Sequence, residues 1–327
     1  MNDDNLAIQI PVSPASPLSR LLGSLRLRLM GLGDQDLAPP MRAWAQAPPA
    51  IANRLTQIVQ SFATGYNLGM SASAVPELLA GLQGHDAERR GFAYEGAGMA
   101  LAIRAQIWPG NHILADFLAA SDKHHYIIQV GAGWAMARVP LRHGAVRAQL
   151  DPVFHWLAMD GFGFHQTFFH TAATVDRQGG RPSGGYAGAA FDQGVGRALW
   201  FVRAADPAEV AATIARFPEA RRADLWGGVG LAAGYAGGVD AATLESLTRR
   251  AGPFRAHMGV GTLLALRTRS RAGNLGPHTE LAVRVLCGGE PESLLSQVEA
   301  EEAKIDHGDE GYPQLRERLR VRLAALH

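Results

Sequence analysis

Carboxylates that stand beside a repeated glycine motif are the residues of this chain best suited to chemistry. Glu95, Asp160 and Asp192 each come one or two residues before a Gly-x-Gly triplet, in otherwise apolar stretches. An unpaired buried carboxylate is too costly, so such a group must be ion-paired, must cap a helix or must serve a function. We predict that these three are acid–base groups of one pocket, with raised pKa values. Capping of their own helix starts is the alternative.

Two histidines and a set of binding residues complete the predicted site. His165 lies in the densest aromatic segment, residues 160–170, and His278 opens a predicted helix in which Glu280 could orient it. Arg197 could orient the acids or bind an anionic end of a substrate. Aromatic side chains could wall the pocket, with ordinary core packing as the alternative for each. The predicted substrate-binding residues are Tyr94, Trp134, Phe162, Gln193, Arg197, Trp200, Trp226 and Glu280.

Metal and nucleophile motifs are weak in this sequence. His165 and His170 stand five residues apart, so they lack the spacing of a helical zinc pair. The single cysteine, Cys287, excludes an intramolecular disulfide and a cysteine-based zinc cluster. No P-loop, nucleophile elbow or metalloprotease helix occurs. We name no metal ligand and leave the cofactor unknown, although an oxidase using His165, His278 and nearby acids stays open.

The glycine triplets that set the positions of these groups recur almost regularly. They begin at residues 96, 131, 161, 194, 228 and 259, in steps of 35, 30, 33, 34 and 31 residues. Such a period is typical of a repeat built from one supersecondary unit. If the units are equivalent, the side chains before each triplet lie at matching heights and converge. These side chains are Glu95, Gln129, Asp160, Asp192, Gln193 and His257.

The repeats predict an all-α fold. Each period has room for two helices of about twelve residues and two short loops. Asp206 and Asp240 read as helix N-caps, and Gly237-Gly238 and Gly288-Gly289 stand where helices should stop. About six helix pairs of 30–35 residues must stack to bury their apolar faces, as an open solenoid or a closed α/α toroid. Gly65, one period before Gly96, indicates an extra degenerate unit.

Glycines inside helices need an explanation, because each costs roughly 1 kcal/mol relative to alanine. One explanation is close packing, in which missing side chains let two backbones approach each other. The other is functional: the glycines clear space beside a cavity or present helix N-termini to a ligand. The sequence leaves both open.

The composition limits the class of protein. The chain has 327 residues, of which 47% are hydrophobic, enough to bury a large core. Thirty-one basic residues balance thirty acidic ones, which argues against nucleic acid and against a polybasic membrane patch. No uncharged apolar run reaches the roughly 18 residues of a membrane span, and no signal peptide is visible. We expect a cytoplasmic protein.

The N-terminal region differs from the rest. Residues 1–50 are broken by Pro11, Pro14, Pro17, Pro39, Pro40, Pro48 and Pro49, with room for one short amphipathic helix over 18–30. We interpret it as an arm over a helical surface, with a membrane anchor as the alternative. Residues 51–327 are predicted to form a single helical-repeat domain.

Several strings resemble a known family. They are residues 92–100 (FAYEGAGMA), 160–166 (DGFGFHQ), 191–200 (FDQGVGRALW), 222–226 (RADLW) and 277–280 (PHTE). They resemble the bacterial family associated with enediyne biosynthesis, the UnbL-type proteins of unassigned function, over roughly residues 20–320. The resemblance implies a role beside a polyketide synthase that makes a linear polyene. It supplies no catalytic residues.

Two function classes follow. In the first, the protein binds a lipophilic polyene or isoprenoid-like substrate in a helical cavity and transforms it by acid–base chemistry, as a cyclase or isomerase does. In the second, it is a non-catalytic scaffold that docks other biosynthetic proteins. A closed apolar chamber with inward acids favours the enzyme, and an exposed polar groove favours the scaffold.

Overall fold

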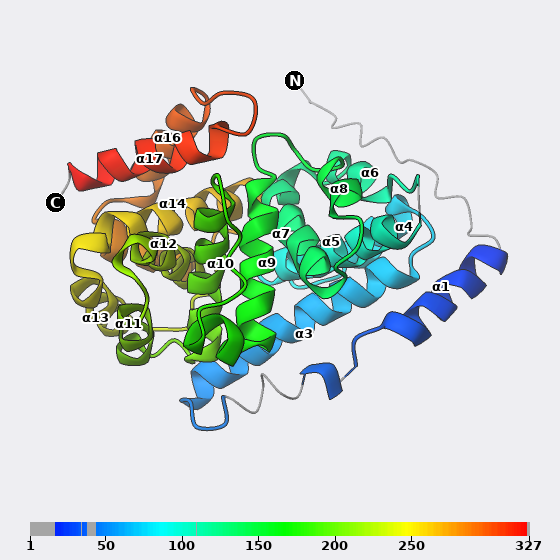
Figure 1. Ribbon diagram of the computed structural model, residues 1–327, viewed down its shortest axis with the longest axis horizontal. Helices are drawn as coiled ribbons and strands as arrows, with labels where there is room; N and C mark the ends of the chain where they lie inside the picture. The colour runs from blue at the N-terminus through cyan, green and yellow to red at the C-terminus, as the bar shows by residue number, and fades with distance from the viewer. Residues whose placement is uncertain (1–16, 34, 38–43, 109, 326–327) are drawn as a thin grey trace, which may run out of the picture.

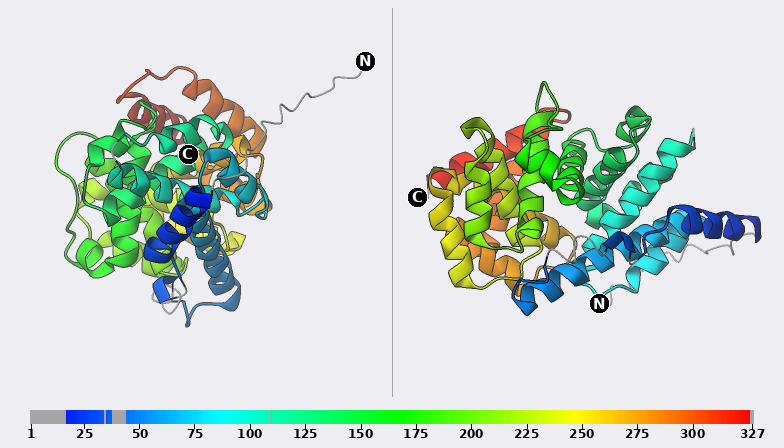
Figure 2. Two further views of the ribbon diagram at one scale, coloured as in Figure 1. Left: turned by 90° about the vertical axis from the view of Figure 1, so that its right-hand side faces the viewer. Right: turned by 60° about the horizontal axis from the view of Figure 1, so that its bottom comes forward.

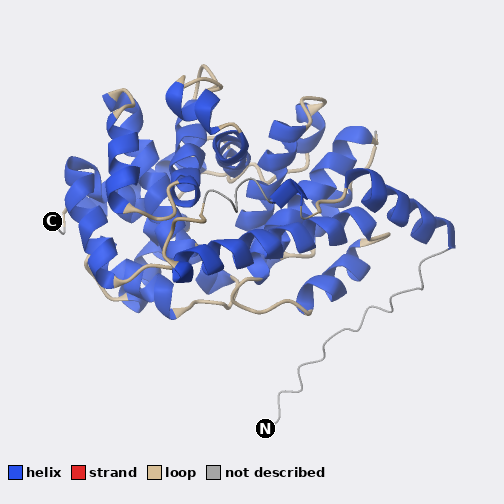
Figure 3. Ribbon diagram, turned by 90° about the horizontal axis from the view of Figure 1, so that it is seen from below, coloured by secondary structure: helices blue, strands red, loops and turns tan. Residues whose placement is uncertain are grey.

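The computed structural model describes residues 17–33, 35–37, 44–108 and 110–325. In these ranges the regular structure is helical (Figure 3), which confirms the predicted all-α class. The expected N-terminal helix is present as α1 (Pro17–Met30). Pro11, Pro14, Pro39 and Pro40 of the predicted arm lie outside the described residues.

Long helices form a row in which each one packs against the next in chain order (Figure 1). We call them the inner helices. Within the described residues they are α3 (Pro49–Ser71), α5 (Arg90–Ile107), α7 (His125–Arg138), α9 (Trp156–Phe169), α10 (Ala187–Val202), α12 (Glu219–Tyr235) and α14 (Arg255–Arg271). The extra unit indicated by Gly65 is α3, at the start of the row.

Shorter helical segments lie between the inner helices and after the last of them. They are α4 (Val75–Gln83), α6 (Ile113–Ala119), η1 (Asp122–His124), α8 (His143–Arg147), η2 (Ala172–Asp176), α11 (Pro207–Ala215), α13 (Ala241–Ala251), η3 (Gly252–Phe254), α15 (Pro277–Ala282) and η4 (Val283–Cys287). The two helices of a unit are thus unequal, not both about twelve residues as predicted. Capping places several boundaries correctly: the Asp206 carboxylate accepts from Ala208 N at 2.7 Å, and α12 ends before Gly237 and Gly238, whose φ angles are positive.

The glycines are the contact points between inner helices. A Cβ on Gly131 would collide with the carbonyl oxygen of Glu95 on the preceding helix. A Cβ on Gly133 would collide with the carbonyl oxygen of Ala158 on the following helix. The same alternation holds for the triplets that begin at residues 96, 161, 194 and 228. The close-packing explanation is therefore confirmed for these glycines.

The two ends of the row depart from this pattern in an informative way. On α3, Gly65 lies against the following helix at Ala93, and its partner position is Ala63. On α14, Gly261 lies against the preceding helix at Gly227, whereas Gly259 contacts Leu323 and Cys287. The sixth in-register glycine is therefore Gly261, and the triplet at Gly259 was two residues out of register.

Segments from both chain ends complete the structure. Figure 2 shows α1 beside α3, and α16 (Pro291–Glu302) and α17 (Gly311–Ala324) at the α14 end of the row. After α1, the amide of Asn67 clamps Leu32, donating to its carbonyl and accepting from its N–H, both at 2.9 Å. Trp44 is buried and donates to the Phe201 carbonyl at 2.7 Å. Among the described helices, none is long and apolar enough to cross a membrane.

Candidate functional site

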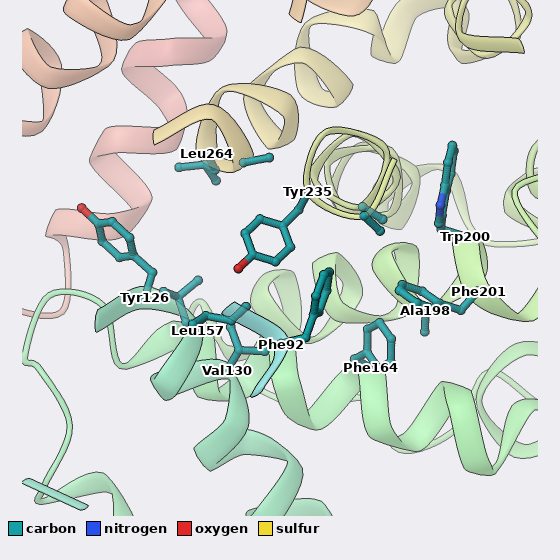
Figure 4. Close-up of a cluster of buried hydrophobic side chains, with 14 of the residues drawn as sticks. Phe92, Tyr126, Val130, Leu157, Phe164, Ala198, Trp200, Phe201, Tyr235 and Leu264 are labelled. Atoms are coloured by element: carbon teal, nitrogen blue, oxygen red, sulfur yellow. The ribbon is translucent and has the colours of Figure 1, made fainter. Parts of the chain in front are cut away.

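The inward faces of six inner helices, α3 to α12, line a cavity of about 310 Å³. Leu32 and residues 35–37, which precede α3 in the chain, also line it. Aromatic side chains form eight of its twenty wall residues. Figure 4 shows two of them, Phe92 and Tyr235, side by side, with their ring centroids 5.0 Å apart. The aromatic wall residues are Phe62, Phe92, Trp134, Phe164, Phe168, Phe169, Phe201 and Tyr235.

Helical periodicity explains which side chains face the cavity. Counted from the glycine that contacts the preceding helix, the inward positions are one residue before it, then three and seven residues after it. Glu95 takes the first position on α5, and Trp134 and Arg197 take the second on α7 and α10. Phe201 and Tyr235 take the third on α10 and α12. Steps of four residues keep these side chains on one helical stripe.

Arg197 forms the polar centre of this wall. Its Nη1 lies 2.5 Å from Asp160 Oδ1, and its Nη2 lies 3.5 Å from Glu95 Oε1. Gln193 donates to the other Asp160 oxygen at 2.6 Å, and Trp134 Nε1 donates to Glu95 at 3.1 Å. All five side chains are buried. One buried cation therefore serves two buried carboxylates, and the closer of them is Asp160.

Glu95 is the carboxyl group that lies farther from the Arg197 cation. Burial raises the pKa of Glu95 to about 7; the charge of Asp160 acts in the same direction, and Arg197 opposes both. Burial also raises the pKa of Asp160, against the opposing effects of Arg197 and Gln193. Although burial disfavours the Arg197 charge, Asp160 and Glu95 raise the pKa of its guanidinium. Near neutral pH, Glu95 can both give and take a proton.

A second, smaller hollow of about 40 Å³ lies beyond the polar centre. Arg197, Leu231 and Tyr235 belong to the walls of both spaces, whereas Asp160 faces the second hollow and Glu95 faces the main cavity. Tyr126, Val130 and Leu157 of the second hollow lie on the far side of Tyr235 from Phe164 in Figure 4. The two carboxylates therefore serve different sides of one partition.

The structure thus brings together five of the predicted residues: Glu95, Asp160, Trp134, Gln193 and Arg197. It does not bring Asp192 to them. Asp192 is fully buried beside Arg221 Nη2, at 2.5 Å, and Arg181 Nε, at 2.8 Å, and it lines neither space. This corrects the prediction of three convergent acids. Asp192 stands one residue earlier in its repeat than Glu95 and Asp160 do, which turns it about 100° away around its helix.

Most of the aromatic residues predicted to line the cavity also lie on other faces of their helices. Tyr94 stacks on His124 and Phe117. Phe162 packs against Phe191, and Trp200 and Trp226 are buried, but none of the three lines the cavity. Tyr94, Trp200 and Trp226 belong to the core and Phe162 packs partly buried against it, as the alternative interpretation held. Gln129 and His257 were also expected to converge on this group. Gln129 Oε1 instead accepts a hydrogen bond from Asp151 N, and His257 lines a surface pocket.

The predicted histidines have separate surroundings. His165 lies against Trp134 and Phe169, and burial lowers its pKa to about 3. His278 lies beside Arg54 and Glu88, and burial together with Arg269 and Arg54 lowers its pKa to about 4. Glu280 pairs with Arg284 instead of orienting His278. No group of three His, Cys, Asp or Glu side chains among the described residues could hold a metal ion.

Sequence reasoning missed most of the true wall. Phe92, Phe164, Phe201, Leu231 and Tyr235 line the cavity, and none was singled out. The available signal was the helical step: three and seven residues after each contact glycine, the chain has Trp134 and Arg138, Phe164 and Phe168, and Arg197 and Phe201. Reading that stripe, in place of the residues nearest each glycine, identifies the wall.

The pH dependence of stability tests the state of Glu95. Between its unfolded pKa of 4.5 and its folded value of about 7, the folded chain holds a proton that the unfolded chain releases. Stability therefore falls as pH rises through this window, by about 3 kcal/mol for this group. We expect Glu95→Gln to raise the unfolding free energy at pH 8 by up to that amount and to leave it nearly unchanged at pH 4. Urea unfolding at both pH values measures this, and an equal effect at both would contradict it.

The fold and the site define an all-helical repeat protein with an aromatic-lined cavity and a buried carboxyl group at its wall. By sequence the chain belongs to the family described as "Protein of unknown function (DUF1702)", whose model matches residues 21–323. No curated protein and no solved structure matches it.

Proposed function

We propose that this protein binds an elongated, unsaturated hydrocarbon chain in the main cavity and transforms it by proton transfer, in the manner of an isomerase or a cyclase. The observation that carries the proposal is Glu95, a buried carboxyl group with a pKa near 7 that opens onto an aromatic cavity beside Arg197. A group poised near neutral pH is suited to general acid–base catalysis.

The walls support this choice of ligand. A cavity of about 310 Å³ falls in the lower range of ligand pockets, and aromatic walls bury apolar surface efficiently. The faces of Trp134 and Phe164 can also stabilise a developing carbocation. Phe164 already lies near a cation, with the Arg197 guanidinium 5.1 Å from its ring centroid. Arg138 and Arg197 are in the wall to hold a carboxylate end of the ligand.

The proposed step balances without an added reactant. The O–H bond of Glu95 breaks and its proton forms a C–H bond with one alkene carbon, which leaves a cation on the chain and a carboxylate on Glu95. Arg197 stabilises that carboxylate, and the aromatic faces stabilise the cation. Loss of a proton from a neighbouring carbon back to Glu95 gives a shifted double bond. Attack by a second alkene before that loss gives a ring.

We further propose that the inner helices form an open solenoid. In a closed toroid α3 and α14 would pack on each other, and we expect such a contact to use glycines as the contacts between the other inner helices do. Each has such a glycine on a single side, with Ala63 and Leu263 at the other positions.

The resemblance to enediyne-associated proteins makes a linear polyene the first substrate to examine.

A binding experiment tests the cavity. We expect a conjugated tetraene fatty acid (parinaric acid) to bind with enhanced fluorescence, and Leu231→Trp, which fills the space between the two hollows, to weaken binding at least tenfold. Leu141→Trp adds the same side chain at a site where the leucine is 61% exposed, so it should bind as the wild type does. Equal binding by all three proteins would contradict the assignment of the cavity.

A second experiment tests the chemistry. After incubation with a panel of linear polyenes and isoprenoid alcohols in D₂O, the product of a protonation–deprotonation cycle carries deuterium, which mass spectrometry detects. We expect Glu95→Gln to abolish deuterium incorporation while it retains binding. Binding without incorporation by the wild type would indicate a carrier. Absence of both, with partner proteins retained on purification, would favour the scaffold.

A further inference from the structure

Helix α1 has an apolar face that no other part of the described chain covers. Its leucines at positions 18, 21, 22, 25 and 29 are between 46% and 72% exposed. Spacings of three and four residues place them on one stripe, which we call the leucine face. A contiguous exposed apolar surface of this kind marks an interaction site.

The opposite side of α1 makes the contact with the body of the protein. Gly23 is buried, and a Cβ there would collide with the Ser71 carbonyl oxygen at the end of α3. Arg26 Nε donates to the Met70 carbonyl at 2.8 Å, and Arg26 Nη2 donates to the Ala72 carbonyl at 3.2 Å. The helix is thus held by a small residue and an arginine, and this hold directs its leucines outward. This contact agrees with the interpretation of the segment as an arm over a helical surface.

The charges on α1 point to the kind of surface that the leucine face meets. The helix contains three arginines and no acidic residue. Arg26 is occupied by backbone carbonyls, whereas Arg20 and Arg28 are exposed. On the helical wheel Arg28 lies next to Leu21 and Leu25. A leucine face with a free arginine, Arg28, at its border and no acidic residue on the helix is the pattern of a helix that lies in the interface of an anionic bilayer.

Self-association fits the same residues less well. A two-fold contact through the leucine face would place the Arg28 side chains of both copies at the edge of the contact. No acid on α1 could compensate them, and juxtaposed like charges oppose binding. Anionic headgroups supply that compensation.

The position of α1 adds an independent argument. The helix ends at Met30, and the next described residues, Leu32 and then Gln35 to Leu37, belong to the cavity wall. Asn67 clamps Leu32 to α3, so the leucine face and the cavity wall are joined by a short, fixed segment. A surface that meets lipid therefore lies next to a space that is lined to receive an apolar chain.

We propose that α1 docks this protein on the surface of an anionic bilayer, with the leucine face in the acyl region and Arg28 on a phosphate group. The helix lies along the surface, because its 14 residues are too short to span the bilayer. Docking does not require the proton-transfer chemistry proposed above.

Vesicle flotation tests the proposal. We expect the whole chain to float with vesicles of equal phosphatidylglycerol and phosphatidylcholine, and to do so much less with phosphatidylcholine alone. Leu21→Glu combined with Leu25→Glu should weaken flotation at least tenfold. Val321→Glu, at an exposed apolar position of α17, is the matched control and should float as the wild type does. Failure of the wild type to float, or equal loss in the control, would overturn the proposal.

Two further measurements show whether a loss of flotation reflects lost membrane contact and not lost folding. Cys287 is fully buried, so Leu25→Cys provides a single reactive thiol for an environment-sensitive fluorophore. Its emission should shift to the blue with anionic vesicles, and the shift should weaken in 0.5 M salt. Light scattering completes the test by measuring the oligomeric state. If the wild type is a dimer that Leu21→Glu/Leu25→Glu converts to a monomer, the leucine face binds a second copy of the chain and the bilayer proposal is overturned.

Discussion

Gly133→Ala is expected to destabilise the protein by about 3 kcal/mol, although alanine is the better helix former by about 1 kcal/mol. The added Cβ would overlap the carbonyl oxygen of Ala158, and backbone atoms of α9 cannot rotate away as a side chain can. Helices α7 and α9 would have to separate, and each packs on another neighbour in the row. The displacement would spread to α5 and α10. Urea unfolding followed by circular dichroism measures the loss.

Gly144→Ala is the matched control. Gly144 is an exposed glycine of α8, and an added Cβ would meet nothing within 4 Å. Here the propensity of alanine acts alone, so stability should stay level or rise by up to about 1 kcal/mol. If the two substitutions had the same effect, the inner helices could not be in backbone contact at Gly133.

The glycine period predicted the fold well because close helix contacts place a strict demand on sequence. Where two backbones touch, only glycine fits, so the contacts remain visible as regular triplets at residues 96 to 230. Asp206 and Asp240 predicted helix starts for a similar reason, since each satisfies backbone N–H groups within its own turn. The unequal helix lengths were missed because length follows from tertiary packing, which has no local signal.

The site was predicted only where the period and the angle agreed. Glu95 and Asp160 both stand one residue before a contact glycine, and both reach Arg197. Asp192 and Tyr94 stand two residues before theirs, and they point elsewhere. The predicted position along the helix axis was correct for all four residues. A shift of one residue, however, turns a side chain by about 100° around the helix, so Asp192 and Tyr94 face other neighbours. The identity of the ion partners depends on neighbouring helices, which one sequence does not specify.

Arg197→Met is expected to destabilise the protein by about 3–5 kcal/mol at pH 8. Methionine fills much of the same volume, but it leaves Asp160 and Glu95 buried without their cation. Without Arg197 the pKa values of both carboxyls rise, and both take up protons as the pH falls. The sign follows: the penalty is largest above the folded pKa values and shrinks toward pH 4, where the neutral forms are populated. Urea unfolding at pH 8, 6 and 4 measures the trend.

Neutralising the acids should reverse much of that loss. In Glu95→Gln/Asp160→Asn/Arg197→Met no buried charge remains in the group, and replacing a whole ionic cluster is far less harmful than removing one partner. We expect this triple variant to recover at least half of the stability and to show little pH dependence. A triple variant as unstable as Arg197→Met would mean that the guanidinium acts through packing against Phe164.

Arg221→Met separates this effect from cavity function. Arg221 pairs with Asp192, a buried carboxylate outside the cavity that also has Arg181. Its loss should destabilise the fold but leave polyene binding intact in the molecules that remain folded. Arg197→Met, measured at a pH and temperature where it is folded, should lower the affinity for a polyene carboxylate more than for the matching alcohol. That ratio isolates the role of Arg197 toward a ligand, because a general loss of structure would weaken both ligands equally.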